Sequence, residues 1–275
     1  MVEVVCEIGI NANGDLAIAK KLIDVAASAG CHYVKFQKRD IDLVYTNEEL
    51  GTPRESPWGT TTREQKNGIE FTFPDYLNID AYCKDKIKWF VSPWDVRSIK
   101  LMAQIKLPFM KIPSALITNE KYLRAIKDAE IDVILSTGMS TLDEIDRAVA
   151  VLGEGRIYCI MHCTSTYPTS PQEVNARCIK TLKERYPWAK IGFSNHYPGL
   201  MAMVLAAAYG AEMLEFHITP DRAMYGSDQA ASIEPQGVFK LMEYLKLINW
   251  MNGDGVKTVY KSELPIIKKL RRGCT

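Results

Sequence analysis

The chain has 275 residues, of which 47% are hydrophobic and 24% charged, as expected for an ordinary soluble globular protein. Lys and Arg total 34 and Asp and Glu total 33, which argues against the broad basic surface of a nucleic-acid-binding protein but allows a local anion pocket. No apolar run approaches the roughly 20 residues that a membrane span requires, and no secretory signal is visible. We expect a cytoplasmic protein of one domain, residues 1–275, with no nucleic-acid or membrane partner.

The seven cysteines are scattered and form no CxxC pair. This pattern indicates reduced, buried thiols in a cytosolic protein. Cys163 follows His162 directly, so a nucleophile with a neighbouring base is an alternative. Adjacent residues of a strand point to opposite faces, which disfavours that alternative.

Short apolar segments alternate with amphipathic segments along the whole chain. The predicted strands are Val2–Gly9, His32–Phe36, Trp89–Ser92, Phe109–Ile112, Asp132–Ser136, Ile157–Cys163, Lys190–Phe193 and Glu212–His217. The predicted helices are Asp15–Ala29, Asp95–Gln104, Asn119–Ala129, Leu142–Leu152, Pro171–Arg185, Gly199–Ala208 and Gln236–Met251. Eight strands with helices between them predict an α/β fold of the (β/α)8 TIM-barrel type.

A doubly wound open sheet is the alternative architecture. It normally uses fewer strands and carries a GxGxxG fingerprint after its first strand, which Gly9 and Gly14 do not make. One long segment, Lys38–Phe73, interrupts the compact connections, and its Thr52–Thr60 part has the composition of an irregular loop over the barrel mouth. Long loops of this kind are usually functional.

Cationic and hydroxyl side chains lie at the ends of several predicted strands. Lys35, Lys111 and Ser136 end three of them, with Ser92 and Ser114 alongside. Because the C-terminal strand ends form the active-site face of a barrel, these groups predict an anion site for a phosphate and a carboxylate. The alternative is that a lysine forms a structural ion pair with a strand-end carboxylate.

Three of the four histidines also lie at strand ends: His162, His196 and His217. The last two end neighbouring strands, so their imidazoles could share a metal that keeps open positions for a substrate.

Three carboxylates complete the predicted mouth. Glu7 and Glu215 could act as a general base or orient a histidine. Glu7 is the candidate for positioning or deprotonating a reacting water. Asp228 follows the last strand, where it either holds sugar hydroxyls or is an ordinary turn residue.

Several motifs, long and in order, resemble the sialic acid synthase family, also called NeuB-like. They are Glu7–Asn11 followed by Gly14, Val34–Gln37, Leu135–Met139, His162–Pro168 and Ile191–His196. The resemblance implies a TIM barrel that condenses phosphoenolpyruvate with an acyclic hexose or amino-sugar aldehyde, such as N-acetylmannosamine. The products would be a nonulosonic acid and phosphate, released by C–O cleavage. It also implies a divalent metal, manganese first, with magnesium or cobalt as alternatives.

The resemblance assigns roles residue by residue. Phosphoenolpyruvate would be held by Lys35, Ser92, Lys111, Ser114, Ser136, Tyr167 and Ser194. The metal would be held by His196 and His217. The residues that contact the sugar and the reacting centre would be Glu7, Gln37, Glu215 and Asp228. The catalytic residues would be Glu7, Lys35, Gln37, His196 and His217.

The chain departs from the family pattern mainly on the sugar side. Ala12 stands where the family has a histidine, Trp94 where it has phenylalanine, Leu116 where it has a carboxylate and Phe216 where it has a basic residue. Many family members also carry a C-terminal antifreeze-like domain over the partner's active site, and we expect this chain to lack it.

Two other functions fit the same pattern. A pyruvate-dependent Schiff-base aldolase would use Lys35 or Lys111 as its nucleophile. A catalytically inactive binding barrel would explain Leu116. For the synthase and for the aldolase we expect a homodimer, because a symmetric dimer is the commonest closed assembly.

Overall fold

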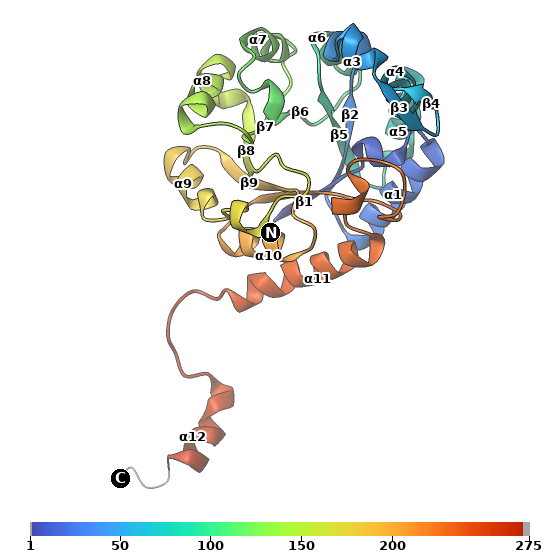
Figure 1. Cartoon of the computed structure of the whole chain (residues 1–275). Coiled ribbons are helices and arrows are strands. Elements are labelled where there is room, and N and C mark those ends of the chain that lie inside the picture. The colour runs from blue at the N-terminus through green and yellow to red at the C-terminus, as the bar shows by residue number, and fades with distance from the viewer. Residues whose placement is uncertain (1, 272–275) are drawn as a thin grey trace.

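The computed structural model describes residues 2–271 and contains a closed barrel of eight parallel strands (Figure 1). The strands are β1 (Glu3–Glu7), β2 (Tyr33–Lys38), β5 (Lys88–Pro93), β6 (Met110–Ile112), β7 (Val133–Ser136), β8 (Ile157–Cys163), β9 (Lys190–Asn195) and β10 (Met213–His217). They pair in the order β1-β10-β9-β8-β7-β6-β5-β2, and β2 closes the ring on β1. The predicted TIM barrel is confirmed.

Successive side chains of each strand point alternately into the barrel and out toward the helices, and this alternation determines which residues fill the interior. Val5, Tyr33 and Met213 point inward in a buried cluster with Phe90, and the residues between them pack outward against the helices. A strand has a side-chain period of two, so the residues two positions further along also face the axis. The inward positions nearest the C-terminal strand ends are therefore the polar ones, including Lys35.

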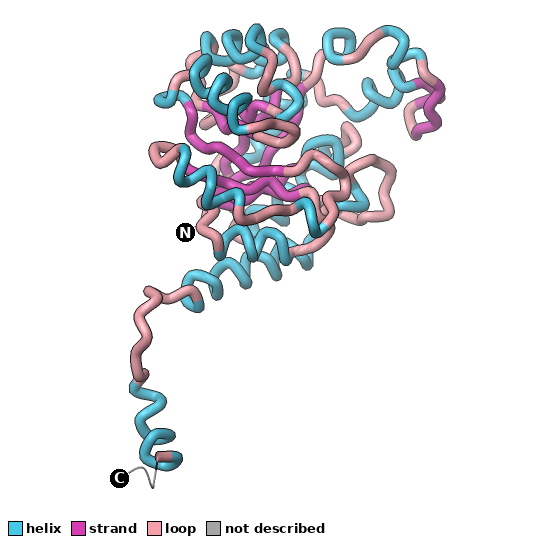
Figure 2. The backbone as a smooth tube through the Cα atoms, turned by 60° about the vertical axis from the view of Figure 1, so that its left-hand side comes forward, coloured by secondary structure: helices cyan, strands magenta, loops and turns pink. Residues whose placement is uncertain are grey.

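Helices surround the barrel. They are α1 (Leu16–Ala29), α5 (Phe73–Cys83), α6 (Val96–Met102), α7 (Glu120–Asp128), α8 (Leu142–Leu152), α9 (Cys178–Arg185), α10 (Met201–Ala208) and α11 (Pro235–Met251). Helix α11 packs against α1 and α10, and α12 (Leu264–Leu270) lies away from the barrel at the end of an extended segment (Figures 1 and 2). Within residues 2–271, no helix has both the length and the apolar character needed to cross a membrane.

Within the segment Lys38–Phe73, the Thr52–Thr60 part is not the irregular loop that the sequence suggested. The segment contains α2 (Ile41–Val44), α3 (Asn47–Gly51), α4 (Thr62–Ile69) and a hairpin of β3 (Pro53–Ser56) with β4 (Gly59–Thr61). Capping boxes begin α3 at Thr46 and α4 at Thr61, each with a glutamate three residues later. These T-x-x-E signals were overlooked because the short helices they start are poor in apolar residues.

A second correction concerns the helix expected at Pro171–Arg185. Its first part is a single 3-10 turn, Pro171–Glu173, and the α-helix begins only at Cys178. Asn175 between them has a positive φ of 39°, which breaks the helical path. The helix α5, Phe73–Cys83, has no predicted counterpart. The other barrel strands and surrounding helices agree with the predictions to within a few residues at their ends.

Asp95 joins the start of α6 to the connection that leaves β2. Its side chain accepts hydrogen bonds from the Ser98 backbone N–H at 2.7 Å and from the Asp40 backbone N–H at 2.7 Å, and it is 8% exposed. We predict that Asp95→Ala lowers the free energy of unfolding by about 2–3 kcal/mol, because a helix cap is lost and a buried donor is left unpaired. Urea denaturation measures this change.

The matched control is Asp15→Ala, which removes the exposed cap of α1. We expect it to cost about 1 kcal/mol. Equal costs for the two variants would show that the contact with Asp40 contributes nothing.

Candidate active site

A cavity of about 190 Å³ opens at the C-terminal ends of the barrel strands. Its lining includes most of the polar side chains singled out from the sequence. These are Lys35, Gln37, Ser92, Lys111, Ser114, Ser136, Tyr167, Ser194, His196, Glu215 and His217. Since they come from different strands, the closed barrel is what brings them together.

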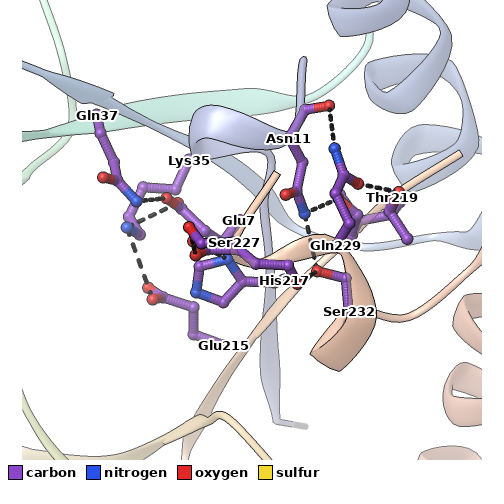
Figure 3. Close-up of polar contacts among 12 residues, drawn as sticks. Glu7, Asn11, Lys35, Gln37, Glu215, His217, Thr219, Ser227, Gln229 and Ser232 are labelled. Carbon is purple, nitrogen blue, oxygen red and sulfur yellow. Dashed lines mark hydrogen bonds and ion pairs between the residues drawn. The ribbon is translucent and has the colours of Figure 1, made fainter. Parts of the chain in front are cut away.

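Lys35 lies at the centre of the polar cluster (Figure 3). Its Nζ is 2.6 Å from Glu7 Oε2 and 3.7 Å from Glu215 Oε1. The other oxygen of Glu7 accepts a hydrogen bond from Gln37 Nε2 at 2.6 Å. A Cβ atom on Gly9 would lie 2.3 Å from that oxygen, so the turn after β1 requires glycine at this position.

Lys111 forms the second ion pair. Its Nζ is 2.6 Å from Glu215 Oε1 and 3.3 Å from Ser194 Oγ. Burial alone would raise the pKa of Glu215, but the charges of Lys111 and Lys35 outweigh burial and lower that pKa to about 2. Glu215 is therefore a buried carboxylate anion, and its Oε2 has no hydrogen-bond partner among the described residues.

The same interactions fix the charge of Lys35. Burial alone would lower its pKa, whereas Glu215 and Glu7 raise it, and the net result is a pKa above the ordinary lysine value. The structural ion pair considered as an alternative is thus present for Lys35, with Glu7. Lys111 pairs in the same way with Glu215.

Hydroxyl groups line the side of the cavity next to Lys111. Ser92 Oγ donates to the Lys111 carbonyl oxygen at 2.8 Å, and Ser114 Oγ accepts from the Gly138 backbone N–H at 3.0 Å. Ser136 lies nearby, with its Oγ 4.0 Å from Cys163 Sγ. Together these groups offer hydrogen bonds to an anion held between the two lysines.

His196 and His217 face each other, with ring centroids 5.5 Å apart. His196 Nδ1 is 2.7 Å from the Thr164 carbonyl oxygen, which can only accept, so Nδ1 carries the proton and Nε2 keeps its lone pair. Burial and the neighbouring His217 lower the pKa of His196 to about 3, so this imidazole is neutral. Tyr167 lies over His196 with a centroid distance of 4.0 Å.

Asp228 lies beside His217, with Oδ2 3.4 Å from Nδ1. Its loop is tied to the turn after β1 by a buried amide network (Figure 3): Asn11 Nδ2 donates to Ser232 Oγ at 2.8 Å, and Gln229 Nε2 donates to the Asn11 carbonyl oxygen at 3.2 Å. Asp228 is therefore held near the histidines and is not a free turn residue. Asn11 was noted only as part of a motif, and neither it nor Gln229 was predicted to have a role in the site.

The hairpin of the Lys38–Phe73 segment reaches the same loop. The Trp58 ring meets Tyr225 edge-on at 5.6 Å, and the Tyr225 hydroxyl donates to the Glu55 carbonyl oxygen at 3.4 Å. Tyr225 precedes Asp228 by three residues. The predicted position of this segment at the mouth agrees with these contacts.

Three expected residues take other positions. Glu7 is fully buried and does not line the cavity, and Lys35 and Gln37 occupy its two oxygens, which argues against the expectation that it handles the water. Asp228 stands next to the lining without being part of it. His162 bonds the Val174 carbonyl oxygen through Nε2 at 2.9 Å, away from the cavity.

The cavity also contains side chains that were not predicted. They are Trp94, Pro113, Ala115, Met139, Cys163 and Ser165. Most are apolar, and an apolar residue at a strand end carries no signal that separates it from the core.

Breaking one ion pair should destabilise the fold. We predict that Lys111→Met lowers the free energy of unfolding by about 3–5 kcal/mol, because it leaves the charge of Glu215 buried without its nearest partner. Adding Glu215→Gln should restore a large part of that loss. Urea denaturation of the single and double variants measures both effects, and a double variant no more stable than Lys111→Met would contradict this account.

Sequence comparison places this geometry among known proteins. Residues 22–257 match the model of the NeuB family. The chain is 34% identical to N-acetylneuraminate-9-phosphate synthase of Drosophila melanogaster, over 98% of this chain and 80% of that protein. It is also 34% identical to N,N'-diacetyllegionaminic acid synthase of Campylobacter jejuni, over 98% of this chain and 83% of the relative.

Solved structures agree with the sequence matches. The sialic acid synthetase of Leptospira borgpetersenii, solved with citrate, superposes with a TM-score of 0.84 at 30% identity, covering 98% of this chain and 93% of that one. A truncated 3-deoxy-D-arabino-heptulosonate 7-phosphate synthase of Thermotoga maritima has a TM-score of 0.65 at 12% identity, which shows a shared fold alone.

Proposed function

This chain belongs to the NeuB family, and we propose that it condenses phosphoenolpyruvate with an acyclic sugar aldehyde to give a nonulosonic acid and phosphate. Its relatives are synthases that make sialic and legionaminic acids. The observation that carries the proposal is that one cavity at the barrel mouth is lined by Lys35 and Lys111, by several serines and by two histidines.

The phosphoenolpyruvate anion fits between the lysines. Lys35 and Lys111 would contact its phosphate and carboxylate, and Ser92, Ser114, Ser136 and Ser194 would supply hydrogen bonds. Both lysines are already neutralised by Glu7 and Glu215. The buried cluster therefore has little net positive charge to offer, and a further cation would favour binding of so highly charged a substrate.

A divalent metal on His196 and His217 would provide that cation. The fit rests on the donors: His196 is neutral with Nε2 available. His217 Nδ1 is buried and makes no hydrogen bond in the described part of the chain, and its neighbour is the Asp228 carboxylate at 3.4 Å. Within residues 2–271, no three His, Cys, Asp or Glu side chains are grouped to hold a metal. Two protein ligands leave positions for substrate and water, as catalytic sites do. When bound, manganese, or alternatively magnesium or cobalt, would polarise the aldehyde oxygen.

The remaining chemistry can be assigned to this chain's side chains. C3 of phosphoenolpyruvate attacks the aldehyde carbon, and the aldehyde oxygen takes up a proton to become a hydroxyl. Water adds to C2 and loses its protons, one to the former aldehyde oxygen and one to the phosphate. The C2–O bond then breaks, so C2 becomes a ketone and phosphate leaves with the bridging oxygen. Glu215 Oε2 is buried and has no hydrogen-bond partner within residues 2–271, so it can accept a hydrogen bond from the attacking water. Gln37 and Asp228 lie at the mouth, where sugar hydroxyls would reach them.

The aldolase alternative is less well supported. A Schiff-base lysine must lose its proton, which a lowered pKa favours. Lys35 has a raised pKa and an ion pair at 2.6 Å, which opposes this role. The inactive-barrel alternative would need the lysines or histidines to be displaced, whereas all four line the cavity.

A phosphate-release assay tests the proposed reaction. We expect release with phosphoenolpyruvate, manganese and a panel of mannose, N-acetylmannosamine and 2,4-diacetamido sugars, free and phosphorylated. Phosphoenolpyruvate labelled with ¹⁸O in its bridging oxygen should transfer the label to phosphate. Borohydride trapping of the protein with pyruvate, together with absent phosphate release, would instead support the aldolase.

The metal ligands can be tested without turnover. We predict that His217→Ala weakens binding of Mn²⁺, followed by electron paramagnetic resonance, by at least about tenfold, because one of two protein ligands is lost. His162→Ala should leave Mn²⁺ binding unchanged, since its ring faces away from the cavity. Chelation should abolish turnover of the wild type. Equal Mn²⁺ affinity in His217→Ala and the wild type would refute the assignment of His217 as a metal ligand.

We also propose a cytoplasmic homodimer. Apolar side chains are exposed on two helices that pack together: Met201 and Leu205 on α10, 71% and 42% exposed, and Phe239 on α11, 47% exposed. Leu205→Lys should shift the mass measured by light scattering from dimer to monomer, because it places a charge in an apolar interface. Leu77→Lys, on the exposed part of α5, is the control. A wild-type monomer at micromolar concentration would refute the dimer.

A further inference from the structure

A second cavity lies at the end of the barrel opposite the candidate active site. It has a volume of about 820 Å³, against about 190 Å³ for the cavity at the mouth. Its lining includes residues that begin three strands: Glu3 of β1, Tyr33 of β2 and Lys88 of β5. Most of the rest comes from the end of α5, the turn that follows it, and residues 106–108 before β6. Side chains at this end of a barrel commonly serve stability, but a cavity of this size is large enough to hold a small molecule.

The positive charges around this cavity are only partly neutralised. Four lysines line it, and one of them, Lys86, forms an ion pair with Asp24 at 3.0 Å. The other three make no ion pair and no hydrogen bond within residues 2–271. They are Lys84, Lys88 and Lys106. Three ammonium groups at one cavity wall are therefore available to a ligand.

Three carboxylates also line the cavity, but two of them already have partners. Glu3 forms an ion pair with Lys190 at 3.2 Å, and Asp80 accepts a hydrogen bond from Trp89 Nε1 at 2.8 Å. The third, Asp85, has no partner in the described part of the chain. Because three unpaired lysines outnumber one unpaired carboxylate, the cavity should attract an anion.

His32 adds a neutral donor to the same wall. Its Nδ1 accepts a hydrogen bond from the Val4 backbone N–H at 3.1 Å. Burial lowers the pKa of His32, and the charge of Lys88 lowers it further, against the opposing effect of Glu3. The ring is therefore neutral and carries its proton on Nε2, an atom that makes no hydrogen bond within residues 2–271. A phosphate oxygen can accept from this N–H and from the lysine ammonium groups.

The cavity is larger than a phosphate group requires, and part of its wall is apolar. Ile87, Leu107 and Pro108 line it beside the lysines. A ligand that fills such a cavity has a negatively charged group for the lysines and an uncharged, partly apolar part for the rest of the wall. A nucleoside monophosphate combines both parts in a molecule of suitable size.

We propose that this cavity at the N-terminal end of the barrel is a second ligand site, which binds a phosphorylated small molecule of nucleotide size through three lysines and His32. The cavity shares no lining residue with the one at the mouth. The proposal therefore does not depend on the condensation reaction.

Histidine resonances report on the two ends of the barrel separately. The chain has four histidines, of which His196 and His217 line the mouth cavity and His32 lines the second one. In spectra of ¹⁵N-histidine-labelled protein, adenosine monophosphate should shift the ring resonances of His32 with a saturable dependence on concentration. Inorganic phosphate should bind there more weakly, since it leaves the apolar wall uncovered, and adenosine should not bind.

Lys106→Glu tests the part played by the lysines. It should weaken binding of adenosine monophosphate, followed at His32, by about five- to tenfold, as expected when one partly screened charge is reversed. The control is Lys180→Glu, which reverses an exposed lysine of α9 on the opposite side of the barrel. Its affinity should equal that of the wild type.

Four results would overturn the inference. The first is a His32 shift that does not saturate. The second is a shift of His196 and His217 with the same midpoint as His32, because the ligand would then bind at the mouth. The third is inorganic phosphate that binds as tightly as the nucleotide, and the fourth is equal weakening in Lys106→Glu and Lys180→Glu. Failure of the proposed function looks different, because the wild type would then release no phosphate with any sugar.

Discussion

Two buried ion pairs underlie the rest of the site. Lys35 with Glu7 and Lys111 with Glu215 take four charged side chains out of water, and each charge is tolerated only because its partner lies within 2.6 Å. The barrel supplies this proximity by placing inward positions of several strands at the same height. Buried ion pairs of this kind contribute little net stability, so they are weak evidence for a role in folding, and the proposed anion site would give them a role in binding.

The same pairing shapes the chemistry. A protonated lysine that is paired with a carboxylate can recognise an anion by hydrogen bonding and by its local charge, but it cannot act as an uncharged amine nucleophile. Glu215 contacts both lysines through Oε1, and its Oε2 has no hydrogen-bond partner among the described residues. Glu7 lies level with Lys35 on the neighbouring strand, where it pairs with Lys35 and accepts a hydrogen bond from Gln37.

The sequence revealed the parts of the molecule that follow simple periodic rules. The barrel and the strand-end lysines and histidines could be predicted, because alternation and parallel strands place them without knowledge of distant contacts. The hairpin at Pro53–Thr61 was missed because its order depends on packing with Tyr225, far along the chain. Trp94 was noted only as a substitution, since an unpaired N–H is visible only once every neighbour has been placed.

The amide network around Asn11 joins residues that are 221 positions apart in the chain, near the seam where β1 meets β10. Glu7 and Lys35 come from the first two strands of the barrel, and Glu215 and His217 come from its last strand. The site therefore does not exist, even in outline, until the final strand enters the ring. Barrel closure and competence to bind are one event for this chain, and a partly assembled barrel would hold two lysines near its axis without all of their counter-charges.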